Sequence, residues 1–170
     1  YIPATPAELG GFIGGTAQMV VNAINSGAFA LQHRDHGYED GWGEPAFKSS
    51  HIDSLKNNQN NELVYVFSIN SLTGKYNISG ECFAEKFHRY TYGGKNAGAL
   101  GVIAASEAVY SFVSDVFLWG MFDNMYPEFM PDYGNNVPMR GFLSAFGTAA
   151  GKLFLQPSQW PYNNDGKEGH

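Results

Sequence analysis

Residues 97–122, AGALGVIAASEAVYSFVSDVFLWGMF, form one long apolar run on which the rest of the chain is expected to pack. Glu107, Ser111 and Asp115 are spaced four apart, which places them on one stripe of a helix. The remaining sides are apolar, so this helix is expected to be mostly buried. About 20 apolar residues would cross a bilayer, but Glu107 and Asp115 interrupt the run at high cost in lipid. A central helix of a globular protein is therefore predicted.

Glu107 and Asp115 are the best-placed pair of carboxylates in the sequence. Two helical turns separate them by about 11 Å along the helix axis. That separation is too long for the two carboxylates of a retaining glycosidase. Each is instead expected to cap a loop or to pair with a basic residue such as Arg89 or Arg140.

Length and composition indicate a single folded domain. The chain has 170 residues, 44% of them hydrophobic and only 15% charged, against about 25% charged in an average domain. The net charge is −6 and the ten Lys and Arg residues are scattered, which argues against nucleic-acid binding. Residues 1–155 are predicted to form one globular domain, and residues 156–170 an extended or flexible tail.

A helix start is predicted near the beginning of the chain. Thr5 would be the N-cap, Pro6 the first helical residue and Glu8 the capping-box partner. Helical periodicity then continues to Leu31. Two glycine pairs spaced four apart would form a flat strip on this helix, suited to packing within the subunit or to a contact between subunits. The strip consists of Gly10, Gly11, Gly14 and Gly15.

An antiparallel hairpin is predicted from two alternating segments, residues 62–69 and 75–84, joined by a short loop at residues 70–74. Val64 and Val66 make the face opposite the main apolar face hydrophobic as well. The first strand is therefore expected to be covered on both sides.

Several features bear on the compartment. Cys82 is the only cysteine, so no disulfide can form within the chain, and a buried, inert thiol is expected. Asn77-Ile78-Ser79 is a glycosylation sequon, which makes Asn77 a candidate site. The chain starts at Tyr1, which suggests a removed leader or a fragment. With low charge and many Asn, Gly and Tyr residues, an extracellular, cell-surface or periplasmic location is predicted.

Possible metal ligands are concentrated in residues 33–45, HRDHGYEDGWGEP. His33, Asp35 and His36 could hold a divalent transition metal, because imidazole and carboxylate suit such ions. No metal-binding motif of diagnostic spacing supports the site. The alternative is a solvated acidic loop, and no cofactor is predicted.

The C-terminal third contains candidate binding surfaces. Residues 123–138 combine three prolines with many aromatic and Met side chains, a density typical of a binding face if it is exposed. Residues 139–155 are predicted to form a last helix, in which Gly141, Gly147 and Gly151 allow close packing. The candidate interface residues here are Met125, Tyr126, Phe129, Met130 and the tail residue Trp160.

Together these patterns predict an α+β fold, in which an N-terminal helix, a small antiparallel sheet built on a hairpin, a long buried central helix and a C-terminal helix follow one another. No GxSxG, HExxH, CxxC or P-loop motif occurs. The leading hypothesis is a non-enzymatic structural subunit that associates with itself or with other subunits of a surface assembly. The alternatives are a small ligand-binding or metal-binding protein or enzyme using residues 33–44, and a small subunit of a membrane complex.

Overall fold

The computed structural model of the protein describes residues 14–59, 62–126 and 144–155. A three-stranded sheet and five helices make up most of it, and two short hairpins, β2–β3 and β5–β6, lie in the connections. In chain order the elements are α1 Ala17–Asn25, β1 Ala30–His33, β2 Gly37–Tyr38, β3 Gly41–Trp42, α2 Ser49–Ile52, β4 Val64–Ser68, α3 Phe83–Arg89, β5 Thr91–Tyr92, β6 Lys95–Asn96, β7 Ala99–Ala104, α4 Ser111–Met125 and α5 Ser144–Leu155.

The central sheet is parallel, with strand order β1-β4-β7. Ala30 lies opposite Tyr65, and Tyr65 lies opposite Gly101. Parallel neighbours need long crossover connections, and here α2 and α3 lie in them. The expectation of mixed helix and sheet is confirmed, whereas the expectation of an antiparallel hairpin is wrong.

The second strand of the predicted hairpin does not form. Gly80, with φ +98°, ends a series of turns after Lys75, and helix α3 begins at Phe83. The Glu85 carboxylate accepts the Cys82 N–H at 3.0 Å and so stabilises the start of that helix. A local cap therefore prevails over a short alternating pattern.

The apolar run at residues 97–122 is likewise not one helix. Residues 99–104 form β7, residues 105–110 turn, and α4 begins at Ser111. Gly98, with φ +75°, precedes the strand, and the β-branched Val102 and Ile103 suit it. A short apolar run fits a buried strand as well as a helix, and the sheet decides between them. The helical half of the prediction is confirmed by α4.

The first described helix begins later than expected. Thr16 is the N-cap of α1, because its Oγ1 accepts the Met19 N–H at 3.2 Å. Leu31, predicted to lie in the helix, belongs to β1. Gly14 and Gly15 precede α1 and are exposed, so they form no helical strip. The predicted cap Thr5 and the glycines Gly10 and Gly11 lie outside the described residues.

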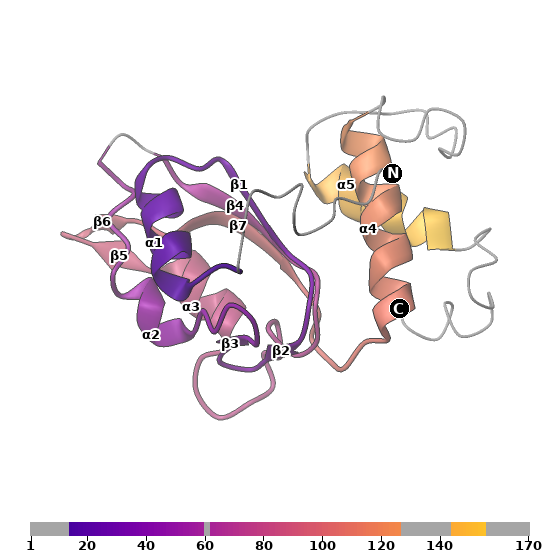
Figure 1. The fold of residues 1–170 in the computed structure, drawn as a ribbon, viewed down its shortest axis with the longest axis horizontal. Helices are drawn as coiled ribbons and strands as arrows, with labels where there is room; N and C mark the ends of the chain where they lie inside the picture. The colour runs from indigo at the N-terminus through magenta and orange to yellow at the C-terminus, as the bar shows by residue number, and fades with distance from the viewer. Residues whose placement is uncertain (1–13, 60–61, 127–143, 156–170) are drawn as a thin grey trace.

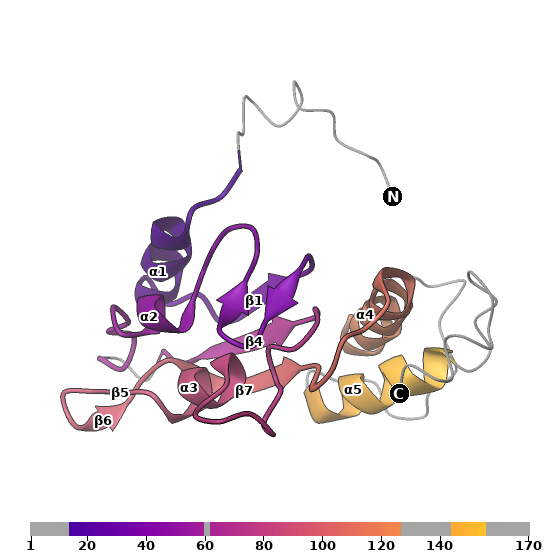
Figure 2. The same ribbon diagram turned by 90° about the horizontal axis from the view of Figure 1, so that it is seen from below.

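Helices cover both faces of the sheet (Figures 1 and 2). On one face, Val64, Val66 and Ala99 pack in a core with residues of α1, α2 and α3. On the other face, Phe67 and Ile69 pack against Met121 and Met125 of α4. Burial on both faces explains why β4 is apolar along its whole length rather than on alternate residues.

Helices α4 and α5 cross each other (Figure 1), and glycines lie at their contact. A Cβ added to Gly151 would lie 2.6 Å from the Phe117 carbonyl oxygen, and one added to Gly120 would clash with Phe154. The prediction of a C-terminal helix with close-packing glycines is confirmed over residues 144–155. No helix in the described part of the chain is long and apolar enough to cross a membrane.

The predicted interface residues of this region have different surroundings. Met125 is buried and packs within the subunit, close to Gly147, so it is not a surface residue. Tyr126 is exposed. Phe129, Met130 and Trp160 lie outside the described residues, as does the predicted tail at residues 156–170.

We expect Gly120→Ala to lower the free energy of unfolding by about 1–2 kcal/mol. Overpacking against Phe154 costs about 1–3 kcal/mol, and the better helix propensity of alanine returns up to about 1 kcal/mol. Urea denaturation measures the change. Gly15→Ala is the matched control, because the nearest atom to its new Cβ would be 3.9 Å away. Equal stability of the two variants would show that the α4–α5 contact tolerates an added methyl group.

Candidate active site

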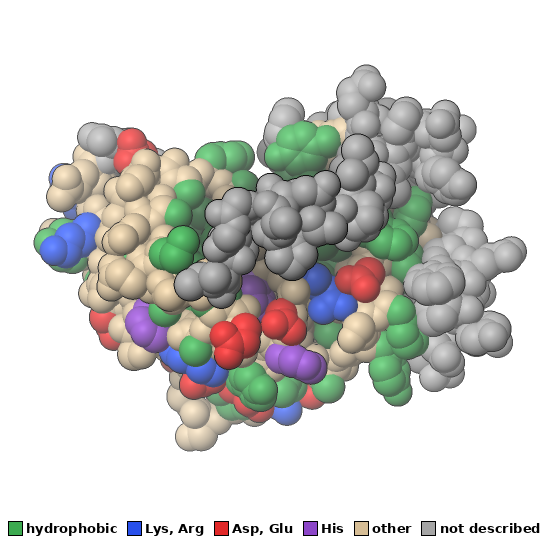
Figure 3. Space-filling view, in the orientation of Figure 1, with side chains coloured by type: hydrophobic (Ala, Val, Ile, Leu, Met, Phe, Trp, Pro, Cys, Tyr) green, Lys and Arg blue, Asp and Glu red, His purple; other side chains and the backbone are tan. Residues whose placement is uncertain are grey.

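The carboxyl ends of the three parallel strands meet at one edge of the sheet. β1 ends at His33, β4 at Ser68 and β7 at Ala104. In α/β folds, the loops that follow such strand ends form the usual ligand site. On the face shown in Figure 3, acidic, basic and histidine side chains gather on the surface between the sheet and α4.

His33 is the buried centre of this edge. Its ring stacks on Trp42 with centroids 4.2 Å apart. Nε2 lies 3.0 Å from the Glu44 carbonyl oxygen, and Nδ1 lies 2.6 Å from Asn70 Nδ2. A carbonyl only accepts, so Nε2 carries the proton and Nδ1 accepts from the Asn70 amide. His33 is therefore neutral, in agreement with burial lowering its pKa against the opposing effect of the Glu44 hydrogen bond.

Asn70 extends this network to the end of β4. Its Oδ1 accepts from Ser68 Oγ at 3.1 Å and from Thr73 Oγ1 at 2.8 Å. Trp42 Nε1 donates to Ser68 Oγ at 2.8 Å. All of these side chains are buried. The network fixes the turn at residues 70–74 against the loop that follows β1.

The turn itself is strained. Leu72 has φ +68°, a left-handed conformation that is rare for a residue other than glycine. Its N–H donates to the Glu107 carbonyl at 3.3 Å, and the Gly74 N–H donates to the Ala105 carbonyl at 2.9 Å. Strain of this kind persists only where the surroundings enforce it, and it concentrates at functional sites.

Ser71 and His36 lie on touching segments of this edge. A Cβ added to Gly37, the residue after His36, would lie 2.5 Å from the Ser71 carbonyl oxygen. His36 is exposed and Ser71 is half-buried. Ser71 Oγ accepts the Val109 N–H at 3.1 Å, which orients the oxygen and leaves its own proton available to a base.

Two ion pairs hold the surrounding loops to α4 and to the β7 turn. Arg34 Nε lies 2.7 Å from Asp115 Oδ1, and Lys75 Nζ lies 3.4 Å from Glu107 Oε2. Of the two alternatives expected for Glu107 and Asp115, capping a loop or pairing with a basic residue, the ion pairs are found. The predicted partners were wrong for Arg89, which pairs with Glu81, whereas Arg140 lies outside the described residues.

The predicted metal ligands are not brought together. Among the residues that the structure describes, no three His, Cys, Asp or Glu side chains converge as a metal site requires. Both ring nitrogens of His33 are used in hydrogen bonds, and Asp35 and His36 are exposed. Residues 33–45 therefore stabilise the sheet edge through the hydrogen bonds of His33.

Cys82 has the surroundings of an inert thiol. It is 1% exposed, and burial raises its pKa. A nucleophilic cysteine needs the opposite, an accessible sulfur with a lowered pKa. The prediction of a buried thiol is confirmed, although Cys82 precedes a helix and does not lie in a strand. Asn77 is exposed in a turn, and its glycosylation stays a prediction.

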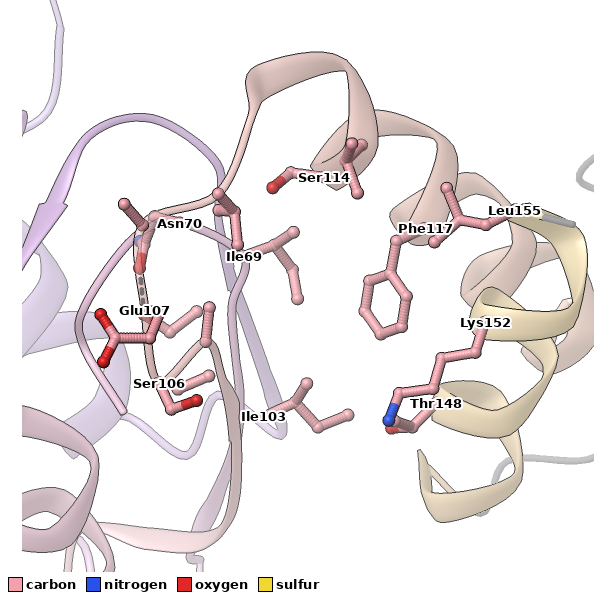
Figure 4. A pocket seen from close by; sticks show the side chains of 16 residues that line it. Ile69, Asn70, Ile103, Ser106, Glu107, Ser114, Phe117, Thr148, Lys152 and Leu155 are labelled. Atoms are coloured by element: carbon pink, nitrogen blue, oxygen red, sulfur yellow. Dashed lines mark hydrogen bonds between the residues drawn. The ribbon is translucent and has the colours of Figure 1, made fainter. Parts of the chain in front are cut away.

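A cavity of about 430 Å³ opens beside Asn70, between the ends of β4 and β7 and the helices α4 and α5. Figure 4 shows Thr148 and Lys152 pointing into it from α5, opposite Ile103. Ser106 and Glu107 lie on the side of the sheet edge. The cavity thus adjoins the turn that carries Ser71.

The carboxyl edge of the parallel sheet thus presents a histidine and an oriented hydroxyl beside a cavity, and sequence comparison identifies the family. The chain belongs to peptidase family C25, whose profile matches residues 5–152. Gingipain R2 of Porphyromonas gingivalis strain ATCC 33277 is 31% identical over 93 residues, which are 55% of this chain and 12% of that protein. Gingipain R1 of the same species is 31% identical over the same length, 9% of its own.

A solved structure shares the fold. The crystal structure of the Arg-specific cysteine proteinase gingipain R superposes with a TM-score of 0.74 at 23% identity, covering 93% of this chain and 34% of that one. The chain therefore spans about a third of the solved structure and a smaller share of the curated relatives.

Family membership overturns the leading functional hypothesis. A non-enzymatic structural subunit of an assembly was predicted, and the match to a peptidase family shows a cysteine-protease-related protein instead. That hypothesis depended on glycine strips, an aromatic segment, low charge and the lack of a short catalytic motif. None of these features excludes a peptidase family.

The place of residues 70–74 at the sheet edge was missed because this segment was interpreted as the loop of an antiparallel hairpin. The signal lay in β4, whose apolar residues occupy both faces. Such strands are typical of parallel sheets, and in a parallel sheet the residues after each strand share one edge.

We expect the stability of the protein to fall as the pH drops below about 6.5. Burial lowers the pKa of His33 in the folded chain, so the unfolded chain takes up a proton near pH 6.5 that the folded chain refuses. Urea denaturation midpoints between pH 7.5 and pH 5 measure the slope. His33→Gln should reduce that slope. His88→Gln, which removes an exposed imidazole, should leave the slope unchanged. An unchanged slope in His33→Gln would contradict the assignment.

Proposed function

We propose that this chain carries the reacting edge of a peptidase, in which Ser71 is the nucleophile and His36 the general base. The observation that supports it most is the position of Ser71, on a strained turn after a parallel strand and against the segment of His36. A strained strand-to-turn junction is a recurrent way to present a nucleophile.

The reaction would be acyl transfer. Ser71 Oγ attacks the carbonyl carbon of a peptide bond and gives its proton to the His36 imidazole. His36 returns that proton to the leaving amine as the C–N bond breaks. A water molecule, deprotonated by His36, then hydrolyses the ester and restores the Ser71 hydroxyl.

Ser71 is preferred to Ser68, Thr73 and Cys82 on accessibility. Ser68 and Thr73 are completely buried and hydrogen-bond to Asn70 and to each other. Cys82 is buried away from solvent with a raised pKa. The chain is therefore related to cysteine proteinases, but its accessible candidate nucleophile is a hydroxyl and not a thiol.

A location outside the cytoplasm, at the cell surface or beyond it, is part of the same proposal. The low charge and the Asn, Gly and Tyr content of the chain support it, as does the relationship to gingipains. Substrates would then be proteins or peptides of the surroundings.

We expect a fluorophosphonate reagent to label the protein once, at Ser71, as read by intact-mass and peptide mass spectrometry. Ser71→Ala should abolish labelling, and His36→Gln should slow it by about a hundredfold, since a general base contributes 10²–10⁴-fold. Ser106→Ala is the matched control, because Ser106 is an exposed hydroxyl on the neighbouring loop.

A second variant separates two causes of failure. Ser71→Cys places a thiol at the proposed position and should react with iodoacetamide faster than a free thiol, in a manner that depends on His36. Labelling that survives Ser71→Ala would overturn the choice of nucleophile. A wild-type chain inert to fluorophosphonate, with a reactive Ser71→Cys variant, would show that the edge suits a thiol and that its hydroxyl does not hydrolyse peptides.

A further inference from the structure

We infer that the cavity between the sheet edge and α5 is a specificity pocket that binds an acidic, glutamate-like side chain of a peptide, with Lys152 as its counter-charge. The inference rests on the proposed function, because it assigns the substrate residue that would lie beside Ser71.

Lys152 is the one cationic side chain among the described residues that line the cavity. It is exposed and points into the space from α5 (Figure 4). No carboxylate within residues 14–59, 62–126 and 144–155 lies within ion-pair distance of its Nζ. A bound anion would therefore meet an ammonium group that no described carboxylate neutralises.

The carboxylates nearby are already engaged. Glu107, which lines the cavity, pairs with Lys75 at 3.4 Å. Asp115, one residue beyond the lining Ser114, pairs with Arg34 at 2.7 Å. A basic side chain entering the cavity would have to compete with these partners and would face Lys152. The charges thus favour an acidic side chain over a basic one.

The walls suit a side chain with an aliphatic stem. Ile69, Ile103 and Phe117 line the space between the sheet edge and α5. The two methylene groups of glutamate would contact these walls, while its carboxylate would reach Lys152. Asn70 lines the cavity and immediately precedes Ser71, so a peptide whose side chain occupies the cavity would pass the proposed nucleophile.

The test measures binding without chemistry. Fluorescent peptides with capped termini, identical except for a central Glu, Gln or Arg, are titrated into the full chain carrying Ser71→Ala, with polarisation as the readout. The central side chain is then the only carboxylate. We expect the Glu peptide to bind about fivefold tighter than the Gln peptide, as for one partly exposed ion pair, and the Arg peptide to bind weakest.

Variants of Lys152 test whether its positive charge causes the preference for the Glu peptide. Adding Lys152→Gln should abolish the preference for Glu over Gln, whereas Lys152→Arg should keep it. Lys95→Gln is the matched control, because it removes the same charge from the exposed β5–β6 hairpin. Thermal denaturation verifies that each variant is folded.

Three results would overturn the inference: equal affinity for Glu and Gln peptides, a preference that persists in Lys152→Gln, or no binding of any of the three peptides. Each is distinguishable from failure of the proposed function. Fluorophosphonate labelling measures the reactivity of Ser71 and does not require an occupied cavity. The binding titration measures peptide affinity for the cavity in a variant that lacks the Ser71 hydroxyl.

Discussion

The hydrogen bond between Asn70 Nδ2 and His33 Nδ1 joins the ends of two parallel strands, and the candidate site depends on it. His33 ends β1 and is fixed by Glu44 and Trp42, while Asn70 follows β4 and binds two buried hydroxyls. Buried polar groups that are fully paired define one arrangement, because breaking any pair leaves a desolvated partner. The segments carrying His36 and Ser71 are thereby placed against each other.

Membership in a family related to cysteine proteases raises the question of where the reacting atom lies. The one cysteine of the chain is in the apolar core beside α3, where its thiol is neutral and shielded. An accessible hydroxyl is instead found on the strained turn after β4. A hydroxyl is a weaker nucleophile than a thiolate and depends more on an adjacent base, which makes the position of His36 decisive for any chemistry at this edge.

Elements governed by local patterns could be predicted from the sequence, and those governed by the sheet could not. Periodicity and composition predict the helices α4 and α5, the packing glycine Gly151 and the burial of Cys82. Residues 99–104 are equally compatible with helix and strand, and only pairing with β4 selects the strand. His36 was identified from the sequence as a candidate metal ligand and not as a general base. Ser71 could not be paired with it, because their proximity comes from strand order and not from spacing along the chain.

The parallel order of the sheet also governs how the molecule reaches this state. Ala30 pairs with Tyr65 and Tyr65 with Gly101, so each strand partner lies about 35 residues away along the chain. Closing such loops costs entropy before any contact repays it, and folds dominated by distant pairings form slowly. The three strand ends of the sheet edge therefore cannot come together as a local fragment. Until β1 and β7 pair with it during folding, the apolar strand β4 exposes unpaired backbone groups along its edges.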